Sequence, residues 1–170
     1  MSILLALDQS SLITGYAIFE NGNLKDWGKI SISASLEVGD RLVEIRNKIS
    51  ELIDKNSIEE VAFEDIQLQN NVGNNVATYK VLAEVFGVIT ELLHEKGIKY
   101  QVVASSSWKS TLKIKGNTRA QQKKNAQEYV LQNYNIKAIQ DTCDAICIGT
   151  HVIKKVRPVE IVSGGFDWSV

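Results

Sequence analysis

The chain has 170 residues, a formal net charge of −1 and an apolar fraction of 44%. These values are typical of a soluble globular protein, and the length suits one domain with a sizeable core. No run of about 18 apolar residues occurs, and no basic segment precedes a long apolar stretch near the start. We therefore expect neither a membrane span nor a secretory signal.

The first part of the chain predicts a three-stranded antiparallel meander, because short polar turns join three runs of β-forming residues. We place the strands at 3–7, 14–19 and 24–32 and the turns at 9–11 and 21–23. The first strand is apolar and ends on Asp8. A carboxylate at the end of a buried strand is poorly placed for packing and well placed for chemistry, although Asp is also a common turn residue.

Helices and strands alternate in the rest of the chain, where Ser35 and Thr118 are suited to cap helices and Gly97 to end one. We expect helices at 36–55, 76–96, 119–133 and 139–155, a short helical segment from Ser105 that holds Trp108, and strands at 58–63 and 99–103. Right-handed crossovers then lay the two later strands parallel to the first. The predicted fold is α/β: a mixed five-stranded sheet, a three-strand antiparallel meander plus two parallel strands, with helices on both faces.

Residues 1–158 form the single domain that we expect. The polar loop Gln67–Asn75 lies within it. Residues 159–170 follow the only proline, Pro158, and include Trp168. We expect this last segment to be a loose C-terminal tail.

Four acids fall where the predicted fold brings them together. Asp8 and Glu64 each end a predicted strand, and in neighbouring parallel strands they would face one another across about 5 Å. Asp141 and Asp144 are three residues apart at the start of the last predicted helix, so both lie on one helix face. Taken singly, Asp141 and Asp144 also suit a helix N-terminus for electrostatic reasons alone.

Converging carboxylates repel one another, so such a cluster persists only if something neutralises it. No nearby cation in the sequence is obviously dedicated to that purpose. Oxygen-only ligands suit Mg²⁺ or Mn²⁺, and two such ions catalyse in-line displacement at phosphorus. The four acids therefore predict a metal-dependent phosphodiesterase site.

The basic residues are unevenly distributed, because no acid occurs between Glu95 and Glu128. That window holds eight of the 19 basic residues: Lys96, Lys99, Lys109, Lys113, Lys115, Arg119, Lys123 and Lys124. A chain of nearly neutral net charge that has one basic face can bind a polyanion.

Together these motifs resemble RuvC-type Holliday junction resolvases over nearly the whole chain. The resemblance is carried by the strand that ends on Asp8, the hairpin with TGYA, FED at a strand end, the segment WKSTLKIKGN, and D-x-x-D opening the last helix. The family has an RNase H-like fold, acts as a homodimer, and uses Mg²⁺, for which Mn²⁺ can substitute, to nick four-way DNA junctions symmetrically. The resemblance implies that the catalytic acids and metal ligands are Asp8, Glu64, Asp141 and Asp144.

Lys109, Lys115 and Lys123 fall in or beside the basic segment of that family. With their neighbours in the same window we expect a DNA-binding set of Lys109, Lys113, Lys115, Arg119, Lys123 and Lys124. Two features depart from the family pattern. Ser10 stands where the family usually has a glycine, and the loop after Glu64, Ile66-Gln67-Leu68, lacks the aromatic residue that often stacks at the junction. These departures resemble a bacteriophage or Gram-positive branch of the family.

Three other functions remain open on the sequence. Another RNase H-like nuclease could act on RNA or on simpler branched DNA. An actin-like or sugar-kinase-like ATPase lobe is suggested because Asp8, a small loop and TGYA resemble a phosphate-binding hairpin, although the chain is short for the two lobes of those proteins. A junction-binding protein without catalysis is the third, and the intact set of four acids argues against it.

Two of the predicted helices have apolar faces whose packing partners we predict. Besides a core-facing stripe, the helix at 76–96 has a second apolar stripe: Val81, Val85, Val88 and Leu92. Two interpretations are open: the helix is packed between the sheet and another helix, or the second stripe is a homodimer face, which we favour. In the last helix we expect the core side to be Ile139, Ile146 and Ile153.

The two cysteines, Cys143 and Cys147, lie four apart in a predicted helix, where a disulfide would be strained. Unpaired thiols favour a reduced, cytoplasmic location. With His151 they form a stripe that resembles zinc ligands, but a fourth ligand is missing, so we favour buried packing over a zinc site.

Overall fold

The structure is a computed structural model that describes residues 2–67 and 75–156. Its elements, in chain order, are β1 (Ile3–Asp8), β2 (Ile13–Glu20), β3 (Asn23–Ser31), α1 (Val38–Asn56), β4 (Glu60–Glu64), α2 (Asn75–Glu95), β5 (Lys99–Val103), α3 (Ser105–Thr111), α4 (Arg119–Tyr134) and α5 (Gln140–Val156). Most of the predicted loop at 67–75 and the whole predicted tail with Trp168 lie outside the described residues. No helix in the described ranges is long and apolar enough to cross a membrane.

The five strands form one mixed sheet in the order β3-β2-β1-β4-β5. β2 pairs antiparallel with β1 and β3, whereas β4 pairs parallel with β1 and β5, which confirms the predicted topology. Asn21 and Gly22 both have positive φ, 52° and 83°, as a tight hairpin turn between β2 and β3 requires. The carboxyl ends of β1, β4 and β5 therefore share one edge of the sheet.

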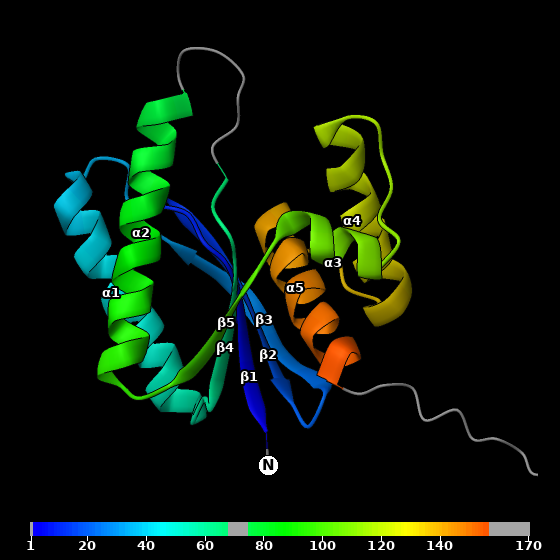
Figure 1. Cartoon of the computed structure of the whole chain (residues 1–170), viewed down its shortest axis with the longest axis horizontal. Coiled ribbons are helices and arrows are strands. Elements are labelled where there is room, and N and C mark those ends of the chain that lie inside the picture. Colours follow the sequence, from blue (N-terminus) through cyan, green and yellow to red (C-terminus); the bar gives the residue numbers. More distant parts are fainter. Residues whose placement is uncertain (1, 68–74, 157–170) are drawn as a thin grey trace, which may run out of the picture.

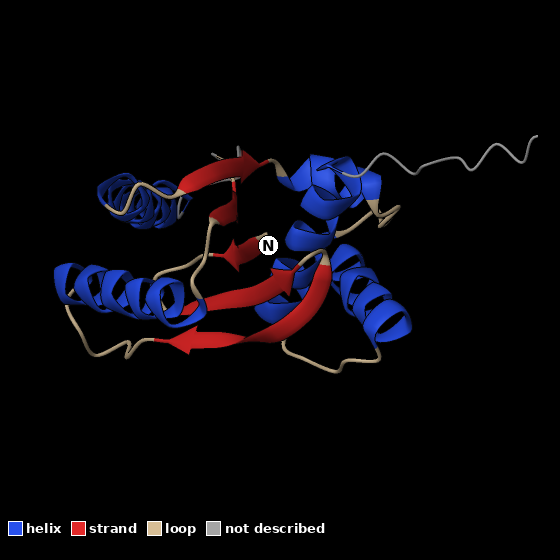
Figure 2. Ribbon diagram, turned by 90° about the horizontal axis from the view of Figure 1, so that it is seen from below, coloured by secondary structure: helices blue, strands red, loops and turns tan. Residues whose placement is uncertain are grey.

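Helices cover both faces of this sheet: α1 and α2 lie on one side, and α3, α4 and α5 on the other (Figures 1 and 2). Alternate residues of β1 divide between the two cores: Leu5 and Leu7 pack toward α1 and α2, whereas Leu4 and Ala6 pack toward α5. Because strand side chains alternate, Asp8 follows Leu4 and Ala6 onto the α5 face. In β4, Glu64 shares the same face with Ala62 in the same way.

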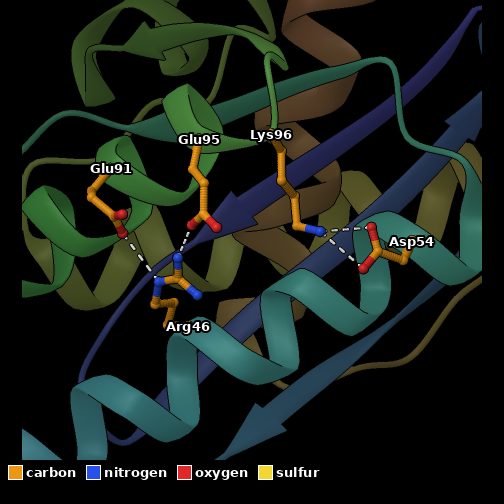
Figure 3. Close-up of polar contacts among 5 residues, drawn as sticks. All are labelled: Arg46, Asp54, Glu91, Glu95 and Lys96. Atoms are coloured by element: carbon orange, nitrogen blue, oxygen red, sulfur yellow. Dashed lines mark hydrogen bonds and ion pairs between the residues drawn. The ribbon is translucent and has the colours of Figure 1, made fainter.

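The predicted dimer stripe on α2 is wrong at two of its four positions. Val85 and Leu92 are 0% and 1% exposed, and they belong to the core that α1 and the sheet share with α2. Ion pairs also join the two helices: Arg46 of α1 pairs with Glu91, at 3.0 Å, and with Glu95, and Lys96 contacts Asp54 (Figure 3). α2 is apolar on two sides because it packs against both the sheet and α1.

Two smaller expectations also differ from the structure. Ile139 is 40% exposed because it precedes the first turn of α5, although Ile146 is buried and Ile153 half-buried as expected. Ser35 does not cap α1, which begins at Val38 after its N-cap residue Glu37. The hydroxyl of Ser35 instead contacts that of Ser33 at 2.8 Å.

Candidate active site

The start of α5 packs directly against the sheet beside Asp8, because Gly15 has no side chain to keep the two backbones apart. Gly15 of β2 pairs with Asp8, and a Cβ at Gly15 would overlap the backbone carbonyl of Asp141. The hydroxyl of Thr142 donates to the carbonyl of Gly28 in β3 at 2.9 Å, which fixes the same turn of α5. This close contact brings the helix that carries Asp141 and Asp144 to the end of β1.

One pocket of about 640 Å³ collects the predicted site residues at this edge of the sheet. All four predicted acids line it, together with three of the six predicted DNA-binding residues. The residues concerned are Asp8, Glu64, Asp141, Asp144, Lys109, Arg119 and Lys123. Acids from β1, β4 and α5 therefore face cations from α3 and α4 across a single hollow.

The other three predicted basic residues are not in the lining of this pocket. Lys113 and Lys115 are exposed in the turn between α3 and α4, where Lys113 has a φ of 57°. Lys124 lies on α4 beside Lys123 but forms an exposed ion pair with Glu128 at 3.7 Å. Only three of the six basic residues predicted to bind DNA therefore line the pocket that holds the acids.

Burial raises the pKa of three acids in the pocket, and repulsion between carboxylates adds to the shift for Asp8 and Asp144. The pKa of Asp8 is raised well above its ordinary value, first by burial and then by the charges of Asp144, Glu64 and Asp141, while Lys123 acts in the opposite direction. Burial also raises the pKa of Asp144, to about 6, although a hydrogen bond from Gln140 to its Oδ2 at 3.2 Å opposes the shift.

The pKa of Glu64 is likewise raised by burial. Three of the side chains that oppose this shift come from α3, with Ser105 first, then Lys109 and Trp108, and Arg119 of α4 also opposes it. Trp108 is 1% exposed, as expected for a core anchor, and Lys109 lies over its ring with Nζ 5.1 Å from the centroid. α3 thus gathers three groups that favour the ionised form of Glu64 at one wall of the pocket.

The donor set of the pocket fits a hard divalent cation. All four acids offer oxygen, the ligand type that Mg²⁺ and Mn²⁺ prefer, and their mutual repulsion raises the pKa of Asp8 and Asp144. Within the described parts of the chain, no three His, Cys, Asp or Glu side chains are gathered closely enough to hold an ion. The four carboxylates therefore line a shared hollow and do not form a closed ligand shell.

The stripe on α5 that resembles zinc ligands is buried in the helix packing. Cys143, Cys147 and His151 are all buried, and both thiols are free. The Nδ1 atom of His151 lies 2.8 Å from the hydroxyl of Thr111, which ties α5 to α3. The stripe is part of the helix packing, as the sequence favoured.

The β1–β2 turn explains how Ser10 replaces the usual glycine. Its hydroxyl donates to the carbonyl of Ile13 at 2.6 Å and accepts from the Ile13 N–H at 3.0 Å, while the Thr14 hydroxyl donates to the Ser10 carbonyl at 3.1 Å. Ser10 is not among the residues with positive φ. Side-chain hydrogen bonds therefore close a turn that needs no glycine at this position.

Sequence reasoning missed Gln9, a buried side chain that is 7% exposed and lines the pocket next to Asp8. It also missed Ser105 and Gln140, whose roles depend on acids distant in the sequence. A long polar side chain between an apolar strand and a turn was the available signal for Gln9. For the other two residues, nothing local distinguishes them from ordinary helix-start residues.

Comparisons with known proteins agree with this geometry. The family model described as crossover junction endodeoxyribonuclease RuvC matches residues 4–151. The RuvC of Synechocystis sp. is 29% identical over 162 residues, which cover 90% of this chain and 92% of that relative. The RuvC of Legionella pneumophila is 37% identical over 75 residues, so that match spans 42% of this chain and only 43% of the relative.

A solved structure shares the fold. T. thermophilus RuvC in complex with a Holliday junction substrate superposes with a TM-score of 0.71 at 13% identity, over 92% of this chain and 96% of that chain. This similarity, together with the mixed sheet covered by helices on both faces, shows an RNase H-like fold. Because the family model covers most of the chain, from β1 into α5, the chain belongs to the RuvC family of crossover junction endodeoxyribonucleases.

Proposed function

We propose that the protein is a Mg²⁺-dependent endonuclease, with Mn²⁺ as an alternative ion, that resolves four-way DNA junctions by paired symmetric nicks. The observation that carries the proposal is the single pocket in which four carboxylates from β1, β4 and α5 face three cations from α3 and α4. A phosphodiester needs both halves of this arrangement. The cations attract its charge, and the acids hold the ion that activates the attack.

The residues divide into two roles. Asp8, Glu64, Asp141 and Asp144 would hold the ion, which when bound supplies Lewis acidity at the phosphorus and a more acidic water. Lys109, Arg119 and Lys123 would bind the phosphate oxygens and orient the scissile strand, as positive side chains do for phosphates in general. Lys109 is suited to this role because it lines the pocket and its ammonium group lies over the ring of Trp108, a favourable cation–π contact.

The acids are tested by Asp8→Asn in an assay with a labelled four-way junction, with Mg²⁺ and with EDTA. Cleavage should fall by at least about 100-fold. Junction affinity in EDTA should stay the same or rise, because the substitution removes one negative charge that faces the phosphates. The control is Asp40→Asn, an exposed acid in the first turn of α1, which should cleave like the wild type. Full-rate cleavage by Asp8→Asn would refute the assignment.

The same assay addresses the rival substrates. A panel of duplex, splayed-arm, four-way DNA and RNA–DNA hybrid substrates should show paired nicks on the four-way junction at the highest rate. Preferential cleavage of the hybrid would instead favour a different RNase H-like activity. A nucleotide-hydrolysing lobe is disfavoured, because the family model of a crossover junction endodeoxyribonuclease matches residues 4–151.

Two symmetric cuts require two acidic pockets, and the described chain contains one. A two-fold dimer supplies the second and matches the symmetry of the junction. The buried Val85 and Leu92 are not available for this contact, so the homodimer through the helix at 76–96 must use another flank of α2. The flank toward α1 is occupied by Arg46 and its partners (Figure 3).

Another flank of α2 adjoins β5, one of the two edge strands of the described sheet. There Phe86 of α2 contacts Phe63, with ring centroids 5.1 Å apart, and Phe63 contacts Tyr100 of β5 at 5.8 Å. Tyr100 and Val102 are 42% and 40% exposed, so the aromatic row continues to an open apolar surface. A second copy of this chain would cover that surface and the outer edge of β5.

A cytoplasmic site for this reaction is supported by the thiols. Cys143 and Cys147 are free and buried, and burial raises the pKa of Cys143 to about 11. Such groups act as small apolar side chains in a reducing compartment.

A further inference from the structure

The side chain of Gln9 holds the backbone of Glu64 at two points. Its Nε2 donates to the carbonyl of Glu64 at 2.6 Å, and its Oε1 accepts from the N–H of Glu64 at 3.2 Å. If the amide were flipped, its NH₂ group would face the N–H of Glu64 and its oxygen would face the carbonyl of Glu64. The two contacts therefore determine the orientation of the amide. Gln9 is 7% exposed, and the residue before it is Asp8.

The sheet itself leaves Glu64 without a strand partner on that side. Pairing between β1 and β4 ends at Leu7 and Phe63, although β1 continues to Asp8 by pairing with Gly15 of β2. The next residue of the chain after Glu64, Asp65, donates its N–H to Val103 of β5 at 2.9 Å. Alternate residues of a strand direct their backbone groups to opposite sides, so those of Glu64 face β1.

A primary amide carries the same donor and acceptor pair as a peptide group. The amide of Gln9 therefore extends the β1–β4 pairing by one residue, past the point where the main chains stop pairing. This extra pair joins Gln9, which directly follows the acid Asp8, to the backbone of the acid Glu64. The contact joins two carboxylate-bearing residues that come from strands 55 positions apart in the sequence.

We infer that Gln9 is a positioning residue that sets the spacing of Asp8 and Glu64, and hence the affinity of the pocket for a divalent cation. The inference rests on the proposed metal site. Gln9 touches neither substrate nor ion in this role, because both of its amide atoms are occupied by the backbone of Glu64. Partners of this kind, which orient ligands from outside the ligand shell, change metal affinity by about 10- to 100-fold when removed.

The first test is the affinity of the DNA-free protein for Mn²⁺, measured by calorimetric titration at pH 7.5. Gln9→Met keeps the length of the side chain and loses both hydrogen bonds, so its affinity should fall by about 10- to 100-fold. Gln9→Asn keeps the amide but is one methylene too short for both contacts, and its affinity should also fall. It serves as the second variant if Gln9→Met does not fold.

The matched control is Gln101→Met. Gln101 lies on β5 and donates its side-chain amide to the Oε1 atom of Glu60 at 2.7 Å, at the other end of β4 from Glu64. A merely structural role for Gln9 predicts that both variants melt at lower temperature while both bind Mn²⁺ like the wild type. A positioning role predicts that only the Gln9 variants need more Mg²⁺ for half-maximal cleavage, with junction affinity in EDTA unchanged.

Two results separate this inference from the proposed function. If wild type and Asp8→Asn bind Mn²⁺ equally, the pocket is not the metal site, and both the function and the inference are refuted. If the wild type binds Mn²⁺ more tightly than Asp8→Asn, while folded Gln9→Met and Gln9→Asn match the wild type within about twofold, only the role of Gln9 is refuted.

Discussion

Asp144 shows the energetic consequence of collecting acids in a buried pocket. Its pKa rises from 3.8 to about 6, mainly through burial and then through the charge of Glu64. The native state therefore binds this proton more tightly than the unfolded chain does. The sign follows from linkage: the contribution of Asp144 to stability is complete below about pH 4, is lost as the pH rises to about 6, and is absent above that.

We predict that Asp144→Asn stabilises the metal-free protein at pH 7.5, because the amide replaces a carboxylate that is costly to ionise. The shift of about two pKa units corresponds to a gain of up to about 3 kcal/mol. Urea unfolding in EDTA at pH 7.5 and at pH 4 measures the gain, which should vanish at the lower pH. A variant less stable than the wild type at pH 7.5 would show that ionising the buried Asp144 is not costly.

The gathering of the four acids could be predicted from the sequence, because each stands at the end of a strand or helix that the hydrophobic periodicity indicates. Asp8 and Glu64 end apolar strands, and Asp141 and Asp144 open a helix. The position of Gln9 after an apolar strand was a signal, but its partner could not be predicted, because that partner is a backbone group 55 residues away in the sequence.

At the scale of elements, α4 presents two different faces to solvent. Lys123 is half-buried in the wall of the pocket and lowers the pKa of Asp8, whereas its neighbour Lys124 is exposed and paired with Glu128. Adjacent helix residues are about 100° apart around the axis, so the two ammonium groups serve different surroundings. The same charge at consecutive positions is therefore expected to contribute unequally to DNA binding.

We predict that Lys123→Ala weakens junction affinity by about 10-fold at low salt and reduces the slope of log affinity against log salt by about 1. Lys124→Ala should change both quantities much less, because this side chain already has a partner. Fluorescence anisotropy with a labelled junction over a series of salt concentrations, in EDTA, measures both. Equal effects of the two substitutions would show that the pocket is not where DNA contacts α4.

The structure of α2 marks where sequence patterns stop being informative. Val85 and Leu92 recur at helical spacing, which indicates that this face of α2 is buried but not which element or chain buries it. In the structure the cover is α1 of the same chain, through a core that includes Ile45 and Ile49. Periodicity gives the width of an apolar surface but does not say which molecule buries it.

For the whole molecule, the proposed dimer leads to a prediction on β5. Val102→Lys places a charge on the open apolar surface that the proposal assigns to a second copy, and the residue is exposed enough for the fold to tolerate it. We expect a monomer by sedimentation at micromolar concentration, with a nearly unchanged melting temperature. It should nick junctions singly and without paired cuts.

Val43→Lys is the matched control, because Val43 is a valine of α1 that is 58% exposed and lies outside the proposed contact. This variant should sediment and cleave like the wild type. A wild-type protein that is monomeric at micromolar concentration would refute the dimer, and a Val102→Lys variant that remains a dimer would refute this choice of surface.

The packing of the start of α5 against β2 and β3 has a consequence for synthesis of the chain. The hydrogen bond from Thr142 to Gly28 spans 114 residues, and α5 carries two of the four acids. A nascent chain still emerging from the ribosome can form the meander early, but it has only half of the acidic set until α5 has been synthesised. Pairing over such separations is also slow. The proposed nuclease activity should therefore be absent from a nascent chain until α5 has been synthesised and has packed against β2 and β3.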